Sequence, residues 1–189
     1  MFSKKETFTV SNLLSFIRLT IALPLWFLLD DIGSANVRLV IIVLALLAII
    51  TDFLDGFIAR RRNEITELGK MIDPLADKFV VGVVAVKLFI IGKIPEYFFF
   101  IVVGRDVLIF LGGILLSSKL GKVLPSNMLG KITVTVLAFL LLLIILNYDQ
   151  SNLIFKIIYF STLILIIASL IAYIVRAIEF IKKKEYGSV

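Results

Sequence analysis

The feature that most constrains this chain is a succession of six long apolar segments separated by short polar breaks. They cover residues 11–29, 37–61, 67–91, 95–118, 127–147 and 153–181. Each is close to or longer than the roughly 20 residues that cross a hydrocarbon core of about 30 Å. Because backbone amides must be paired within lipid, such segments must be helices. The sequence therefore predicts an all-α integral membrane protein, with six transmembrane helices in one bundle and a single domain over residues 1–189.

The positive charges predict how these helices are oriented. If the N-terminus is cytoplasmic, the outer loops hold only Arg38, Lys93 and Lys156, whereas the inner segments hold twelve cations. Those twelve are Lys4, Lys5, Arg60, Arg61, Arg62, Lys70, Lys119, Lys122, Lys131, Lys182, Lys183 and Lys184. This positive-inside bias predicts a multi-pass protein of a bacterial-type cytoplasmic membrane, with both termini in the cytoplasm. It also accounts for the net charge of +6 without a nucleic-acid partner. Arg18 and the lack of a small-residue cleavage site argue against a cleaved signal peptide.

Four aspartates interrupt the apolar pattern: Asp52, Asp55, Asp73 and Asp77. A charged side chain at the centre of a membrane helix costs about 2.5–3.5 kcal/mol on insertion scales, so a retained cluster indicates function. Asp52 and Asp55 are three residues apart, and Asp73 and Asp77 are four apart, so each pair occupies one helix face. In the predicted orientation, all four lie in one layer below the cytoplasmic surface, and two consecutive antiparallel helices would let the pairs face each other.

The residue types near these aspartates narrow the chemistry. The chain has no cysteine and no histidine, which excludes thiolate and imidazole metal sites and histidine-based proton transfer. Four converging carboxylates would repel one another unless divalent cations neutralise them, and an all-oxygen donor set favours Mg²⁺, Mn²⁺ or Ca²⁺. Gly56 and Gly69 each lie one turn from an aspartate and leave room for a bulky ligand, while Arg60 could clamp a phosphate. Together these residues predict a cradle for a diphosphate.

Two other interpretations of the aspartates stand beside this one. A lone intramembrane aspartate is often a buried hydrogen-bonding residue, but four at this spacing with two glycines favour a site. A divalent-cation transporter could also use intramembrane carboxylates. Transport needs a polar route to the far side, and residues 37–51 and 79–91 contain only Arg38 and Lys87 as charged groups. Two cations are a poor lining for a cation path, which leaves transport as the remote alternative.

Residues 52–77 read D-x-x-D-G-x-x-A-R-x(8)-G-x-x-x-D-x-x-x-D, which resembles the signature of the CDP-alcohol phosphotransferase family at every fixed position. Those positions are Asp52, Asp55, Gly56, Ala59, Arg60, Gly69, Asp73 and Asp77. The resemblance implies a Mg²⁺- or Mn²⁺-dependent transferase that moves a phosphatidyl-type group from a CDP-linked lipid to an alcohol and releases CMP. It implies that the four aspartates bind the metal ions and that Asp77 is also the general base. The CDP-lipid, expected to be CDP-diacylglycerol, would contact the following residues: Asp52, Asp55, Gly56, Arg60, Gly69 and Asp73.

Other short stretches bear on the acceptor alcohol. The sequences NLLSFIR (residues 12–18) and GKMIDPLADK (residues 69–78) are similar to the phosphatidylglycerophosphate synthase branch, whose acceptor is glycerol 3-phosphate. Ser15 is a minor departure from that branch. Gly104-Arg105-Asp106 is closer to the cardiolipin synthase branch, whose acceptor is phosphatidylglycerol. Gly130-Lys131, followed by Thr133, occurs in both. Glycerol 3-phosphate is therefore the expected acceptor, and the alternatives are phosphatidylglycerol or the acceptor of another CDP-alcohol phosphotransferase.

Cations outside the motif are candidates for binding the phosphate of the acceptor: Arg105, Lys119, Lys122, Lys131 and Arg176. Arg105 and Arg176 stand out because they lie within apolar segments. Each could instead extend to the membrane surface or pair with a nearby acid, Asp106 or Glu179. Neither arginine distinguishes glycerol 3-phosphate from a phospholipid, because both acceptors carry phosphate. A monomer and a homodimer both remain open.

Overall fold

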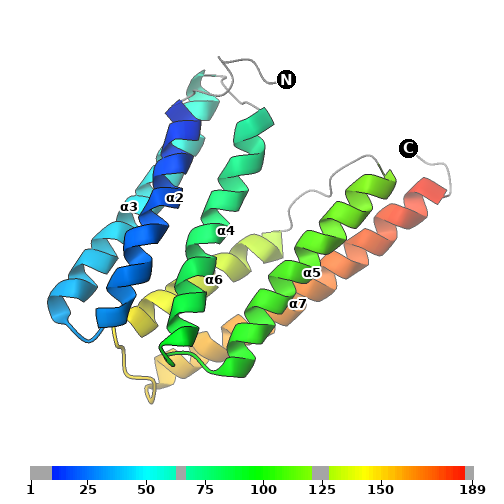
Figure 1. Ribbon diagram of the computed structural model, residues 1–189. Helices are drawn as coiled ribbons and strands as arrows, with labels where there is room; N and C mark the ends of the chain where they lie inside the picture. The colour runs from blue at the N-terminus through cyan, green and yellow to red at the C-terminus, as the bar shows by residue number, and fades with distance from the viewer. Residues whose placement is uncertain (1–9, 63–66, 121–127, 186–189) are drawn as a thin grey trace. The chain divides into compact units, whose positions relative to one another are not determined.

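The structure, a computed structural model, describes the backbone of residues 10–62, 67–120 and 128–185, and the side chains of residues 16–51, 54, 79–116 and 128–182. Its elements are helices with short connections (Figure 1). They are α2 (Val10–Leu28), the short 3₁₀ helix η1 (Leu29–Asp31), α3 (Ala35–Arg62), α4 (Glu67–Ile90), α5 (Glu96–Leu120), α6 (Met128–Ile145) and α7 (Leu153–Glu185).

The predicted apolar segments coincide with these α-helices to within a few residues at each end. Within the described residues, three stretches are long and apolar enough to cross a membrane by themselves: Glu96–Leu116, Met128–Ile145 and Leu153–Lys182. Ala35–Thr51 and Phe79–Ile90 are shorter apolar stretches. Large apolar side chains such as Leu39, Phe110 and Phe160 are exposed along the helices. An exposed apolar surface of this extent suits contact with lipid, and it identifies an integral membrane protein.

Two helices end in a residue with left-handed backbone geometry. Gly92, which follows α4, has a φ of 69°. The N–H of Gly92 donates to the carbonyl of Phe89 at 2.9 Å, and the N–H of Lys93 donates to the carbonyl of Leu88 at 2.8 Å. This pattern pairs carbonyls that the last helical turn leaves without partners. Asn147 follows α6 in the same way, with a φ of 57°. The left-handed residue ends the helix and turns the chain at each of these points.

The connection between α6 and α7 is shaped by two polar side chains. Asp149 Oδ1 accepts from the N–H of Ser151 at 2.9 Å, and Asn152 Oδ1 accepts from the N–H of Ile154 at 2.9 Å. Asn152 therefore caps the N-terminus of α7. The N–H of Ser151, and then its hydroxyl, stabilise the Asp149 carboxylate and hold its pKa below the usual value.

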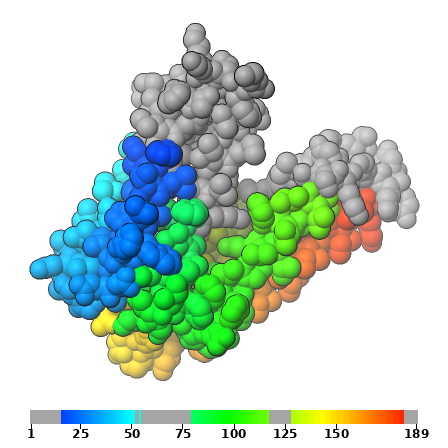
Figure 2. All heavy atoms as spheres, in the orientation of Figure 1, coloured from blue at the N-terminus to red at the C-terminus, as the bar shows by residue number. Residues whose placement is uncertain are grey.

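The helices form two compact units, residues 1–93 and residues 94–189. In the first unit, α2 packs against both α3 and α4. Figure 2 shows the described atoms of α2 (blue) against those of the later part of α4 (green). The buried apolar side chains come from all three helices: Ile21, Ala22, Leu25, Ile41, Ala48, Val84, Ala85 and Leu88. The helix that links the other two in this unit is therefore α2.

In the second unit, α7 packs against both α5 and α6. Its core contains the following buried side chains: Phe98, Val102, Leu137, Leu140, Leu141, Ile144, Phe155 and Ile166. Thr133 Oγ1 on α6 lies 2.7 Å from the Leu129 carbonyl of its own helix and 3.2 Å from the Leu165 carbonyl of α7. A hydroxyl shared in this way joins two helices in an otherwise apolar contact.

The contacts between α5 and α7 occur in the same order along both helices. Near their starts, the hydroxyls of Tyr97 and Tyr159 are 2.7 Å apart. Further along, the Tyr173 ring covers Gly112, where a Cβ atom would lie 3.1 Å from Tyr173 Cε1. The absence of a side chain at Gly112 thus lets the ring approach the α5 backbone. The rising residue numbers on both helices show that α5 and α7 run parallel.

Candidate functional site

The backbone places the acidic motif on two helices of the first unit. Asp52 and Asp55 lie in the second half of α3, and Asp73 and Asp77 lie in the first half of α4. Both stretches are helical, so the three- and four-residue spacings bring each pair to one helix face. Aspartate offers only oxygen ligands, the type that a hard divalent cation prefers. Among the described side chains, which do not include these four aspartates, no group of three or more acidic, histidine or cysteine residues could hold a metal.

Several predicted roles fall on side chains outside the described set. They belong to Asp52, Asp55, Gly56, Arg60, Gly69, Asp73, Asp77, Lys119 and Lys122. Metal binding by the aspartates, the base role of Asp77 and the facing of α3 by α4 therefore stay predictions. The structure adds that α2 contacts both motif helices. The two helices that carry the motif therefore share α2 as a neighbour.

A buried arginine on α2 was not among the predicted site residues. Arg18 is only 2% exposed in the helix that packs against α3 and α4. A guanidinium inside an apolar segment is costly to keep, which is the signal that could have singled it out. Arg18 lies 34 residues before the first motif aspartate, and only the packing of α2 brings its helix beside α3 and α4.

The second unit holds a buried arginine whose partners are described. Arg105 on α5 is 6% exposed. Its Nε donates to Ser169 Oγ on α7 at 3.1 Å, and its Nη1 forms a short ion pair with Asp106. The ion pair between Arg105 and Asp106, which the sequence offered as an alternative, is therefore present, and the acceptor role of Arg105 stays a prediction. Its third nitrogen, Nη2, lies beside Gly130 on α6, where a Cβ atom would be 3.4 Å away.

The cluster of Arg105, Asp106, Gly130 and Ser169 joins all three helices of the second unit. The Asp106 carboxylate lies beside the guanidinium and lowers the cost of burying its positive charge among apolar helices. Because Ser169 and Asp106 occupy Nε and Nη1, the guanidinium is held in one orientation. A planar guanidinium held in this way is suited to binding a phosphate through its remaining donors.

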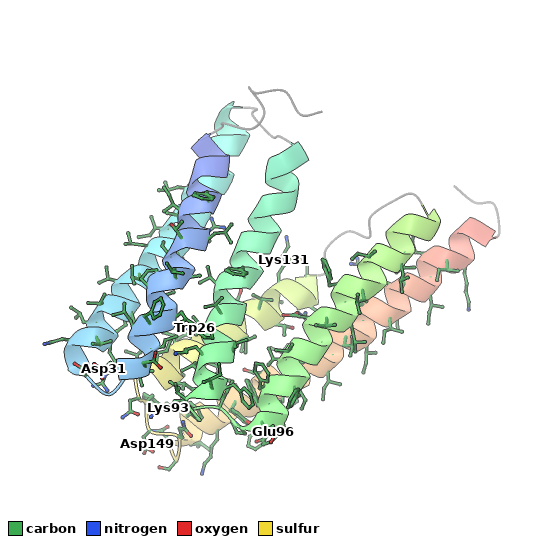
Figure 3. The ribbon with its side chains drawn as sticks, viewed as in Figure 1. Trp26, Asp31, Lys93, Glu96, Lys131 and Asp149 are labelled. Carbon is green, nitrogen blue, oxygen red and sulfur yellow. The ribbon has the colours of Figure 1, made fainter. Side chains whose placement is uncertain are left out.

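The other described candidates for the acceptor phosphate are exposed. Lys131 follows Gly130 in the first turns of α6 (Figure 3), and Arg176 lies near the end of α7. Within the described side chains, no ion pair joins Arg176 to Glu179. Of the two, only Lys131 is next in sequence to a residue of the Arg105 cluster. The structure thus places Lys131 next in sequence to a residue that Arg105 contacts, whereas within the described side chains no hydrogen bond or ion pair joins Arg176 to that cluster.

A second charged cluster lies in the first unit, between the end of α4 and η1. Lys87 on α4 places its Nζ 2.7 Å from Oδ1 and 2.8 Å from Oδ2 of Asp30 in η1. The same Nζ lies 4.8 Å from the centre of the Trp26 ring. Figure 3 shows Trp26 and Asp31 at this end of the unit, where α2 gives way to η1. The sequence interpretation noted Lys87 only as an obstacle to cation transport and did not identify its partner.

Comparisons with known proteins bear on the whole chain. A family model described as CDP-alcohol phosphatidyltransferase matches residues 8–176. The CDP-diacylglycerol--glycerol-3-phosphate 3-phosphatidyltransferase of Aquifex aeolicus is 35% identical over 182 residues, which cover 93% of this chain and 99% of that protein. The protein of the same name from Rickettsia bellii is 35% identical over 145 residues, covering 76% of this chain and 78% of that protein. A CMP-forming cardiolipin synthase of Rattus norvegicus is 37% identical over 108 residues, but these cover 57% of this chain and 34% of that protein.

Proposed function

Because the chain belongs to the CDP-alcohol phosphatidyltransferase family, we propose that it transfers the phosphatidyl group of CDP-diacylglycerol to the hydroxyl of glycerol 3-phosphate and releases CMP. The observation that carries this proposal is the likeness to the Aquifex aeolicus transferase, which extends over almost the whole of both chains. Phosphatidylglycerol as the acceptor has weaker support. The likeness to cardiolipin synthase covers about a third of that protein, although Gly104-Arg105-Asp106 resembles its branch.

In the proposed reaction, the acceptor hydroxyl oxygen forms a bond to the phosphorus of the phosphatidyl group. The bond from that phosphorus to the bridging oxygen breaks, and CMP leaves with the electron pair. The Asp77 carboxylate takes the proton from the hydroxyl, a role that no histidine in this chain could fill. Arg60 binds the diphosphate, and Gly56 and Gly69 leave room for the nucleotide.

The four motif aspartates would hold the divalent cation or cations, Mg²⁺ or Mn²⁺. Their pairing on adjacent turns of α3 and α4, with oxygen as the only donor atom, fits these ions. When bound, the metal supplies positive charge that neutralises the diphosphate as CMP departs. The distribution of cations along the chain supports six spans, with both termini and the motif on the cytoplasmic side.

The test is CMP release by the purified full-length protein in detergent or liposomes. CDP-diacylglycerol and Mg²⁺ or Mn²⁺ would be combined in turn with glycerol 3-phosphate, phosphatidylglycerol, serine or inositol phosphate. We expect CMP with glycerol 3-phosphate, and loss of the activity when EDTA removes the metal. Release of CMP with phosphatidylglycerol alone would move the protein to the cardiolipin synthase branch. No CMP with any acceptor would refute the proposed reaction, and the mass of the solubilised particle would decide between a monomer and a homodimer.

A further inference from the structure

The Arg105 side chain is hydrogen-bonded to a residue that has no role in the reaction proposed above. Ser169 on α7 is 2% exposed, and its Oγ accepts a hydrogen bond from Arg105 Nε at 3.1 Å. The same Oγ donates to the carbonyl of Ile166 at 2.9 Å. The hydroxyl proton is therefore committed to Ile166, which leaves an oxygen lone pair directed at the guanidinium. This polarity makes Ser169 an acceptor that matches a donor-only side chain.

The third nitrogen of the guanidinium, Nη2, lies beside a glycine, Gly130. Nη1 is paired with Asp106, and within the described residues Nη2 has no hydrogen-bond partner. A Cβ atom at Gly130 would lie 3.4 Å from Nη2, so glycine leaves that side of the nitrogen uncovered. Rotation of the guanidinium would break the bond to Ser169. The orientation of Nη2 thus depends on the contact that the neighbouring Nε makes with Ser169.

We propose that Ser169 is a positioning residue, which fixes the plane of the Arg105 guanidinium so that Nη2 meets the acceptor phosphate beside Gly130. The inference rests on the proposed function, because it requires that an acceptor carrying phosphate binds next to α6. A preorganised guanidinium loses less entropy on binding than a free one, so its affinity for phosphate is higher. Without Ser169 Oγ, Nε would lack a hydrogen-bond acceptor among apolar side chains, and the guanidinium would rotate toward another partner.

A purely structural role for Ser169 makes a different prediction. Removing a buried hydroxyl that joins α5 to α7 would destabilise the second unit and lower activity with both substrates. A positioning role instead raises the KM for the acceptor and leaves the KM for CDP-diacylglycerol unchanged, because the nucleotide lipid is assigned to the motif on α3 and α4. Thr162 on α7 offers a matched control. It is also fully buried, and its Oγ1 donates only to the Ile158 carbonyl of its own helix.

The experiment measures CMP release by the full-length protein with each substrate varied in turn. We expect Ser169→Ala to raise the KM for glycerol 3-phosphate about tenfold, the size of effect that one hydrogen bond to a charged group supports. Its KM for CDP-diacylglycerol should stay within about twofold, and Ser169→Thr, which keeps the hydroxyl, should restore the acceptor KM. Thr162→Val should leave both values unchanged. If phosphatidylglycerol is the productive acceptor, the same series applies to its KM.

Two further variants distinguish an effect that acts through Arg105 from misfolding of the Ser169 variants. In an Arg105→Lys background, which has no Nε, Ser169→Ala should add less than a twofold change. Gly130→Ala places a methyl group at ordinary contact distance beside Nη2 and should raise the acceptor KM even if the Ser169 variants do not fold. Equal changes in both KM values with Ser169→Ala, or an unchanged acceptor KM with Arg105→Lys or Gly130→Ala, would overturn the inference. Wild-type protein that released CMP in those experiments would still support the proposed function, whereas no CMP with any acceptor would overturn both.

Discussion

The ion pair between Lys87 and Asp30 leads to an asymmetric prediction. The Lys87 side chain is 7% exposed, and that of Asp30 is 57% exposed, although they form one contact. Replacing Asp30 by asparagine leaves a buried ammonium without its counter-ion. Replacing Lys87 by methionine leaves an aspartate that water can solvate and keeps most of the apolar stem. We therefore expect Asp30→Asn to destabilise the first unit more than Lys87→Met.

The geometry bounds the size of the effect. For unit charges at the 2.7 Å between Nζ and Oδ1, Coulomb's law gives about 1.5 kcal/mol at the dielectric constant of water and about 6 kcal/mol at an effective value of 20. The exposed side of Asp30 places the pair in the lower half of this range, and asparagine still offers an oxygen to the ammonium. We expect Asp30→Asn to lower the free energy of unfolding by about 2 kcal/mol, about a 30-fold change in the equilibrium constant. Lys87→Met should cost less than about 1 kcal/mol, the value of a lost contact with Trp26.

The assay is SDS-induced unfolding of the full-length protein in detergent micelles, followed by tryptophan fluorescence and far-ultraviolet circular dichroism. Trp26 is the only tryptophan in the chain and lies 4.8 Å from Lys87 Nζ, so its emission reports on this site. Asp31→Asn, next in sequence and with the same loss of charge, is the control and should have little effect. In a Lys87→Met background, Asp30→Asn should also become neutral. Equal costs for Asp30→Asn and Asp31→Asn, or a larger cost for Lys87→Met, would refute the reasoning.

Three other predictions address the proposed chemistry and the second unit. Asp77→Asn should abolish CMP release but keep most of the affinity for CDP-diacylglycerol, because three aspartates remain for the metal; near wild-type turnover would exclude Asp77 as the base. Gly112→Ala should lower the free energy of unfolding by about 1 kcal/mol relative to Gly113→Ala, because only its methyl group would displace the tyrosine ring of α7. Thr133→Val should cost about 1 kcal/mol by removing a hydrogen bond between helices, whereas Thr135→Val removes only an exposed bond within α6. Unfolding midpoints in SDS would show equal effects within each pair if either packing argument is wrong.

The positions of the helices could be predicted from the sequence because they depend on local properties. Apolar runs of about 20 residues, broken by glycine, asparagine and clustered charges, indicate where helices begin and end. Gly92, at the predicted break after residue 91, has the left-handed geometry that glycine adopts readily. The pairing of Arg105 with Asp106 was also foreseen as an alternative, since the two residues are adjacent in the chain.

The contacts between helices could not be predicted in the same way. A helix that is apolar on every side has no polar stripe to show which face packs against a neighbour. Ser169 lies 64 residues from Arg105, and Lys87 lies 57 residues from Asp30. Both pairs depend on how the helices are rotated about their axes. The same reason explains why the buried position of Arg18 and the contacts of α2 with both α3 and α4 emerged only from the structure.

The two ends of the first unit differ in a way that favours transfer over transport. Lys87 follows Asp77 by ten residues on α4, a separation of about 15 Å at about 1.5 Å per residue. The ammonium of Lys87 is committed to Asp30, so it is not the counter-ion of the motif aspartates. A cation that moved along α4 from the motif would approach this buried positive charge and the Trp26 ring rather than further carboxylates. The predicted acidic site toward one end of the unit and the neutralised lysine toward the other therefore support the proposal that substrates enter and products leave on the same side of the membrane.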